Sequence, residues 1–192
     1  MKKLLFIFMC AIISANANAQ IWVGGEIGLK LSSTKVGDFK MDSKNSFEIN
    51  PEIGYSFNDK WAVALRLGYA HFDNAETQLI DQTVIGNYNR FRIEPFVRYT
   101  FYKAGKFSFF ADGGIYYSAL SKSNYDDALH TMGVGINPGL RFAINDKVGL
   151  TGHLGGIGYE HSWMKNNGMK LKNDTFSFNI IDDITFGVYV NL

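Results

Sequence analysis

One phrase recurs along the chain and constrains its fold more than any other feature. Asn or Glu is followed by Pro and by a run with apolar side chains at alternate positions, in copies that begin at Asn50, Glu94 and Asn137. The prolines stand about 44 residues apart, and a fourth copy, without proline, runs from Asp182 to Leu192. Alternation is the period of a β-strand. Each repeat is therefore predicted to be a strand, a short turn, a second strand and a long connection, and four repeats make a barrel of about eight strands.

The N-terminus indicates export. Lys2 and Lys3 precede an apolar stretch from Leu4 to Ile13, and Ala17-Asn18-Ala19 supplies the small residues that a signal peptidase requires. We interpret residues 1–19 as a secretory signal peptide and residues 20–192 as one barrel domain, because no Pro- or Gly-rich linker divides the rest. No apolar run in the sequence is long enough for a transmembrane helix.

Composition agrees with an exported barrel. The one cysteine, Cys10, lies inside the predicted signal peptide, so the mature chain would be held together without disulfides. Loss of Lys2 and Lys3 would change the formal charge from +1 to −1, a balance that does not favour nucleic acid as a partner.

The predicted strands are joined by connections of two lengths. The strands are 21–31, 47–57, 61–72, 90–101, 107–119, one ending at 144, 148–159 and one ending at 192. Tight turns follow Phe57, Phe101 and Ile144, whereas long polar connections cover residues 32–46, 73–89, 120–131 and 160–174. Outer-membrane barrels have short turns in the periplasm and long loops outside, so the same orientation is predicted here.

The two faces of these strands differ in chemistry. One face is aliphatic and carries aromatic residues near both ends, namely Tyr55, Phe57, Trp61, Tyr99, Phe101, Phe107, Phe109 and Phe142 near the turns, and Phe47, Tyr69, Phe91 and Tyr117 near the long connections. The other face mixes glycines with charges: Gly24, Gly28, Gly54, Gly68, Gly114, Gly133, Gly135, Gly139, Glu26, Glu48, Glu52, Arg66, Arg92, Glu94, Arg98, Asp112 and Arg141. Two aromatic girdles around an aliphatic band are typical of a bilayer-facing wall. The glycine-rich charged face fits a narrow lumen, where a long arginine needs an empty place beside it. The fold class predicted is therefore all-β, an eight-stranded antiparallel up-and-down transmembrane barrel.

Opposite charges are predicted to meet inside. Counting antiparallel pairs from the turn between Phe57 and Trp61 places Glu52 opposite Arg66, and the next hairpin brings Arg98 near Asp112. About eight strands leave room only for side chains, so we expect these charges to plug the lumen.

Three prolines do not fit a closed sheet easily. Pro51, Pro95 and Pro138 recur on alternate strands, although proline lacks the ladder donor and is normally kept out of interior strands. A bulge shared by the three strands is one explanation.

The chain resembles the small eight-stranded outer-membrane barrels of Gram-negative bacteria, OmpA-like or OmpX-like, from Gln20 to Leu192. The resemblance rests on the Ala-Asn-Ala signal end, the repeated Asn-Asp-Lys turns and the alternating last strand. It implies that the last strand is recognised by the barrel-insertion machinery, although this strand ends in Leu192 where that family often has Phe. A periplasmic peptidoglycan-binding domain, present in larger members, is not implied.

One cluster has the ingredients of a hydrolase. Glu160, His161 and Ser162 supply carboxylate, imidazole and hydroxyl, and lipid A deacylases are barrels that use such residues. Adjacent residues of a strand point to opposite faces, however, so His161 and Ser162 are not expected to act together. A rim histidine and a loop serine are the better interpretation.

Neither metal binding nor a cofactor is predicted. His71, His130 and His161 lie toward the long connections without the spacing of metal ligands. Lys165, Lys170 and Lys172, beside Met164 and Met169, could contact lipopolysaccharide phosphates, although such a loop is more often simply solvated.

The sequence thus predicts a non-enzymatic, monomeric outer-membrane protein without catalytic, cofactor or metal-binding residues, with a structural, adhesive or surface-binding role. Its predicted partners are outer-membrane lipids, lipopolysaccharide and an extracellular ligand at the loops. An envelope lipid hydrolase, an acyl transferase and a small-solute channel remain as alternatives.

Overall fold

The structure is a computed structural model that describes residues 20–32, 35–36, 39–40, 44–79, 82–122, 128–166 and 169–192. The predicted signal peptide lies outside these ranges. No helix within them is long and apolar enough to cross a membrane, a result that concerns helices alone.

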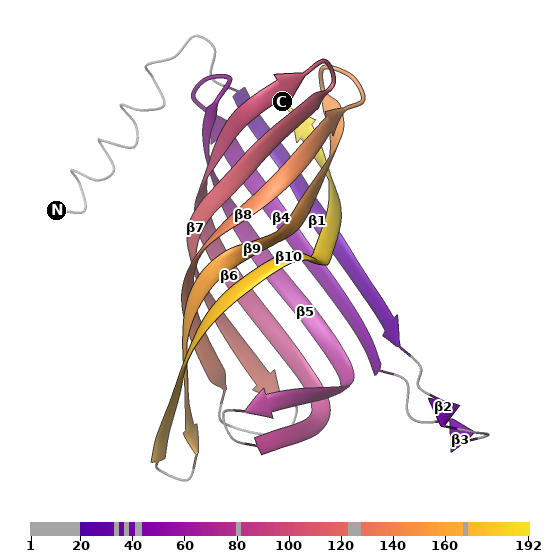
Figure 1. Cartoon of the computed structure of the whole chain (residues 1–192), viewed down its shortest axis with the longest axis vertical. Coiled ribbons are helices and arrows are strands. Elements are labelled where there is room, and N and C mark those ends of the chain that lie inside the picture. The colour runs from indigo at the N-terminus through magenta and orange to yellow at the C-terminus, as the bar shows by residue number, and fades with distance from the viewer. Residues whose placement is uncertain are drawn as a thin grey trace, which may run out of the picture.

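Eight long strands close into an antiparallel barrel, as the repeat predicts (Figure 1). In wall order they are β1 (Gln20–Ser32), β10 (Met169–Asn191), β9 (Val148–Asn166), β8 (Leu129–Ala143), β7 (Phe107–Lys122), β6 (Gln82–Ala104), β5 (Trp61–Leu79) and β4 (Lys44–Ser56). The short strands β2 (Lys35–Val36) and β3 (Phe39–Lys40) pair with each other outside the barrel.

The repeated Asn-Asp-Lys turns have the same local structure. Asn58 Oδ1 accepts hydrogen bonds from the backbone N–H groups of Lys60 and Trp61, at 2.8 and 2.9 Å. Asn145 Oδ1 does the same with Lys147 and Val148, at 2.9 and 2.8 Å. An asparagine side chain that replaces a backbone acceptor fixes a tight turn, and a fixed turn sets the register of both flanking strands.

The opposite end of the barrel differs from the sequence-based prediction. Residues 73–89 and 160–174 were predicted as loops, but β5 and β6 stay paired up to Leu79 and Gln82, and β9 and β10 up to Asn166 and Met169. That prediction was wrong because these segments are rich in polar residues and lack the regular apolar alternation that marks a strand. Figure 1 shows these long hairpins at the end away from the C-terminus.

The two faces of the wall are arranged as predicted. Aliphatic side chains of the outer face are exposed, among them Ile53, Val97 and Val134 at 53%, 42% and 51%. Both aromatic sets accompany them on the outside, and cross-strand pairs such as Trp61 and Tyr99, with ring centroids 4.5 Å apart, form the band near the short turns. The face with the charged residues points inward. Glu26, Glu52, Arg66, Glu94, Arg98 and Asp112 on it are buried, whereas Glu48, Arg92 and Arg141 are half-buried.

The prolines interrupt the ladder in two ways. At Pro51 and Pro95 the pairing with the following strand skips two residues and resumes in the same register. At Pro138 the register shifts by one residue against β9, where Gly155 has φ 85°. A bulge shared by all three prolines is therefore not observed, because an unpaired extra residue occurs only at Pro138, and it lies on the neighbouring strand β9.

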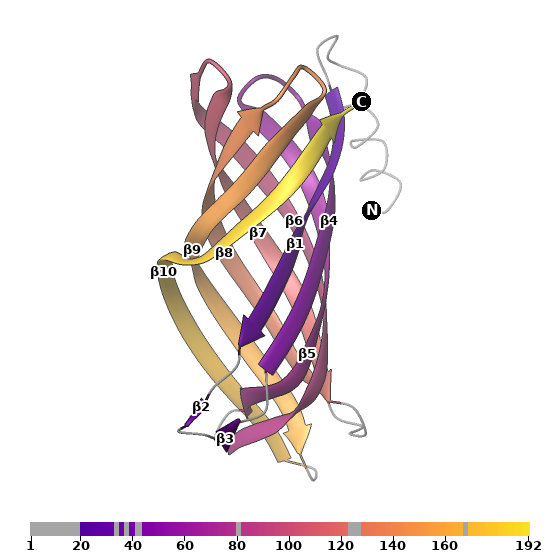
Figure 2. The same ribbon diagram turned by 90° about the vertical axis from the view of Figure 1, so that its right-hand side faces the viewer.

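The wall is least paired between its first and last strands. β1 pairs with β4 from Gln20 to Ser32, but its described pairs with β10 cover only Trp22 to Glu26. From Met169 to Ile180, β10 follows β9 alone; it bends at a register shift between Ile180 and Ile184, and only its last residues pair with both β9 and β1 (Figure 2).

Candidate functional site

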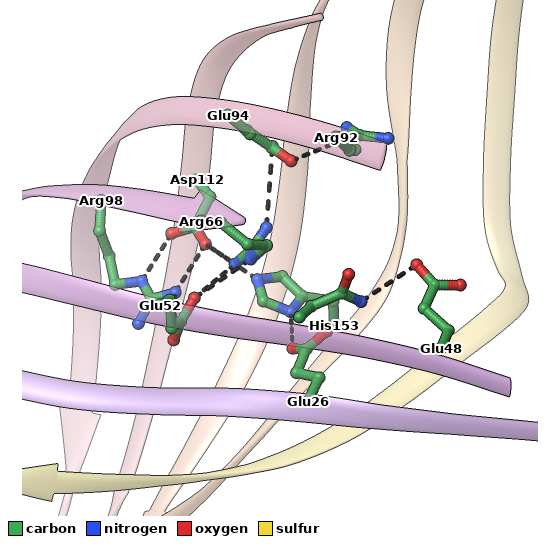
Figure 3. A network of polar contacts seen from close by, with 10 residues as sticks. Glu26, Glu48, Glu52, Arg66, Arg92, Glu94, Arg98, Asp112 and His153 are labelled. Carbon is green, nitrogen blue, oxygen red and sulfur yellow. Dashed lines mark hydrogen bonds and ion pairs between the residues drawn. The ribbon is translucent and has the colours of Figure 1, made fainter. Parts of the chain in front are cut away.

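Asp112 is the centre of a charged network inside the barrel (Figure 3). Its Oδ1 lies 2.6 Å from Arg98 Nε, and its Oδ2 accepts from Arg98 Nη2 at 2.7 Å. The same Oδ2 lies 3.3 Å from Arg66 Nη2 and 2.9 Å from His153 Nε2. With no exposed surface, this carboxylate depends entirely on these three partners for the interactions that water would otherwise supply.

The network continues from Asp112 to three further carboxylates. Arg66 Nη2 contacts Glu52 Oε2 at 2.8 Å, and Arg66 Nη1 lies 3.7 Å from Glu94 Oε1. His153 Nδ1 lies 2.6 Å from Glu26 Oε1. Since each ring nitrogen of His153 faces a carboxylate oxygen, the ring satisfies both partners only as an imidazolium with two donors.

Hairpin register positions the two pairs predicted from the sequence. Glu52 is the direct partner of Arg66 across β4 and β5, and Arg98 is the direct partner of Asp112 across β6 and β7. Both predicted pairings are confirmed. Inward-facing residues that are direct cross-strand partners hold their charged ends within hydrogen-bonding distance.

Glu26 and His153 were missed as partners by the sequence interpretation. They come from β1 and β9, which are separated in the wall by β10, and meet inside the barrel over that strand. The sequence feature that could have placed His153 inside the barrel is strand alternation, which puts it on the same inward face as buried Thr151. Alternation along a strand does not determine which other strand an inward side chain will contact.

Aromatic rings pack against the arginines on the short-turn side. Phe96 is buried, and the Arg98 guanidinium carbon lies 4.1 Å from the Phe110 ring centroid and 4.9 Å from that of Trp22. A Cβ on Gly54 would lie 2.2 Å from the Trp22 ring. Glycines were predicted to leave room for arginines, but here the absent side chain makes room for an aromatic ring.

A cavity of about 680 Å³ lies on the long-hairpin side of the network. Two arginines on its wall already have partners. Arg90 Nη2 donates to Glu48 Oε1 at 2.9 Å, and the Arg92 guanidinium carbon stands 3.7 Å from the Tyr116 ring centroid. The Tyr116 hydroxyl donates to Glu160.

The structure separates the three residues with hydrolase chemistry. Glu160 and Ser162 face inward, where they contact Tyr116 and Thr131 respectively. His161 faces outward, and its Nδ1 lies 2.7 Å from Asp174 Oδ1. Neighbouring strand residues point to opposite faces, so no triad forms from this set.

The three histidines considered for a metal have separate partners. His71 contacts Asn89 and Asp73, His130 contacts Tyr117, and His161 contacts Asp174. Across the part of the chain that the structure describes, no group of three His, Cys, Asp or Glu has the geometry to hold a metal ion.

The sequence model of the family described as outer membrane protein beta-barrel domain matches residues 4–180. The chain therefore belongs to this family, and it is an outer-membrane protein. Among curated proteins, none matches the chain significantly.

Solved structures agree on the fold. The chain is similar to the outer membrane protein OprG from Pseudomonas aeruginosa, with TM-score 0.52, 14% identity, and coverage of 92% of this chain and 97% of that one. A major outer membrane protein from Thermus thermophilus gives TM-score 0.51 and 9% identity, with 92% and 100% covered. Neisserial surface protein A gives TM-score 0.47 and 15% identity, with 91% and 97% covered. At these identities the similarity to the first two structures concerns the fold alone. Together with the family match it confirms the resemblance to small outer-membrane barrels.

Proposed function

We propose that this outer-membrane barrel is a non-enzymatic scaffold with a closed lumen, which acts through the outer wall and rim of its long-hairpin end. We assign this end to the outside of the cell, and the short turns to the periplasm, because that asymmetry is the rule in outer-membrane barrels. We also retain residues 1–19 as the signal peptide that directs export.

The proposal rests on the number of barrel strands that contribute a side chain to the charged network. Glu26, Glu52, Arg66, Arg98, Asp112 and His153 come from β1, β4, β5, β6, β7 and β9, which are six of the eight barrel strands. Each is at most 8% exposed. Ion pairs across so narrow a lumen leave no continuous water path unless several buried contacts break together, and each break would leave an unpaired charge.

Planar-bilayer recording tests the closed lumen. Purified wild-type protein, confirmed as folded by its faster gel migration before boiling, should give no stable conductance steps. A porin reconstituted in the same bilayer serves as the positive control. Stable steps from the wild type would contradict the proposal and favour the small-solute channel.

Incubation with lipid A tests the absence of lipid chemistry. Because Glu160, His161 and Ser162 do not converge, the mass of lipid A should stay unchanged after prolonged incubation with folded protein. Loss or gain of an acyl chain, absent from a boiled control, would favour the hydrolase or acyl-transferase alternative.

A further inference from the structure

A row of aromatic and histidine rings crosses the outer wall over β7, β8 and β9. Its members, in order, are Tyr117, His130, Trp163 and His161. Successive ring centroids lie 6.0, 5.7 and 5.7 Å apart, with planes inclined by 19°, 24° and 28°. Tyr117 Oη lies 2.8 Å from His130 Nδ1, which further fixes the first two rings. We call these four residues the ring row.

The carboxylate beside the ring row is already engaged. Asp174, on β10, accepts a hydrogen bond from the Tyr159 hydroxyl at 2.8 Å, and the same oxygen lies 2.7 Å from His161 Nδ1. Its negative charge is therefore directed toward the rings.

Three lysines extend the ring row toward the tip of the β9–β10 hairpin. Lys165 and Lys170 are direct cross-strand partners, and Lys172 is the partner of Trp163, so all three share the outward parity of the ring row. All three are exposed. Like charges placed directly opposite one another destabilise a sheet. A bound anion would offset that repulsion.

The distance of the lysines from the hydrocarbon layer indicates which kind of phosphate can reach them. A tilted strand crosses the hydrocarbon in about 9–11 residues, so β9, which begins at Val148, leaves it near Gly158. Lys165 stands seven residues farther on, roughly 15–20 Å along the barrel axis at the usual tilt. Phospholipid phosphates lie at the interface itself. A phosphate that reaches Lys165 must therefore be carried on a saccharide above the bilayer.

We propose that the ring row and Lys165, Lys170 and Lys172 form a binding site for one phosphorylated glycolipid of the outer leaflet. The lysines contact phosphates on its saccharide, and the ring row packs along the sugar. The proposal deepens the proposed wall function and rests on the orientation with the long hairpins outside. It does not depend on a closed lumen, so conductance would not bear on it.

Binding of fluorescent lipopolysaccharide with a phosphorylated core, added to phosphatidylcholine vesicles that contain the folded protein, tests this site. The test variant carries Lys165→Gln, Lys170→Gln and Lys172→Gln. A matched control carries Lys60→Gln, Lys103→Gln and Lys147→Gln, which removes the same charge at the short turns. A third variant replaces the three hairpin lysines by arginine, which keeps the charge. Gel migration before and after boiling checks that every variant is folded.

The hairpin glutamine variant should bind at least about tenfold more weakly than wild type, because each lysine near an anionic surface contributes substantially. The control and arginine variants should bind like wild type, and chemical removal of the core phosphates should weaken wild-type binding by a similar factor. Equal binding by the two glutamine variants would overturn the proposal. It would also be overturned if phosphatidylglycerol vesicles produced the same difference, because a phospholipid would then suffice.

Discussion

Glu52 and Arg66 face each other across β4 and β5, with Arg66 Nη2 2.8 Å from Glu52 Oε2 inside the barrel wall. Their side chains are 0% and 9% exposed. Charges so deeply buried stabilise the fold only while they are paired, because removal of either partner takes away the nearest counter-charge of a group that water does not reach.

A double-mutant cycle should reveal this dependence. Glu52→Ala and Arg66→Ala should each lower the free energy of unfolding, by about 3–5 kcal/mol, because each removes the nearest counter-charge of a buried group. The double mutant should cost clearly less than the sum of the two. Urea unfolding in lipid vesicles, followed by gel migration, measures all four proteins. Strictly additive effects would show that the pair is not coupled as the structure indicates.

Asp112 should be far more sensitive than a partly exposed carboxylate. Asp112→Ala removes the shared acceptor of Arg66, Arg98 and His153, so we expect a loss of about 3–5 kcal/mol. Glu48→Ala is the matched control, because its side chain is 33% exposed and pairs with Arg90 at 2.9 Å, and a pair in water contributes about 1 kcal/mol or less. Similar losses in the same urea assay would argue against Asp112 as the centre of the network.

The sequence allowed the local part of this network to be predicted. Glu52–Arg66 and Arg98–Asp112 each lie within one hairpin with a short turn, so counting outward from the turn gives their register. Glu26 and His153 are 127 residues apart and meet inside the barrel over β10, the strand between β1 and β9. Their contact depends on the tilt and stagger of the closed barrel, which no single hairpin determines.

Strand length and interior packing were less predictable for other reasons. Beyond the bilayer, β5 and β6 continue to Leu79 and from Gln82 without the apolar alternation that lipid contact imposes. The glycine positions were recognised as spaces, but whether an arginine or a ring such as Trp22 fills each space depends on side-chain rotamers. Alternation in sequence carries no information on rotamers.

Addition of one methyl group should therefore distinguish inward from outward glycines. Gly139→Ala should lower stability by about 1–3 kcal/mol, because its Cβ would lie 2.3 Å from the Phe110 ring and 2.8 Å from the Gly152 carbonyl oxygen. Gly113→Ala is the control, since nothing lies within 4 Å of its added Cβ. Thermal unfolding followed on gels compares the two. A loss at position 113 as large as that at 139 would contradict the packing described.

The outward contacts of Asp174 should determine its titration. Hydrogen bonds from His161, and to a smaller extent from Tyr159, hold the pKa of the Asp174 carboxyl below its usual value. The stabilisation from these hydrogen bonds is therefore fully present above the ordinary aspartate pKa and is lost as the pH falls through the lowered pKa of the folded protein. In carboxyl-carbon NMR titrations, His161→Phe should raise the Asp174 pKa more than Tyr159→Phe does. The reverse order would show that Tyr159 is the main partner.

Cysteine labelling in intact cells tests the orientation on which the glycolipid site depends. Lys172→Cys places a thiol on the exposed outer face of the long β10 extension, whereas Asp59→Cys places one in an exposed short turn at the other end. A membrane-impermeant maleimide should label Lys172→Cys on whole cells and spare Asp59→Cys, and both should react after the outer membrane is permeabilised. The only natural cysteine, Cys10, would be removed with the signal peptide and give no background. Labelling of Asp59→Cys alone in intact cells would reverse the topology and place the lysines in the periplasm.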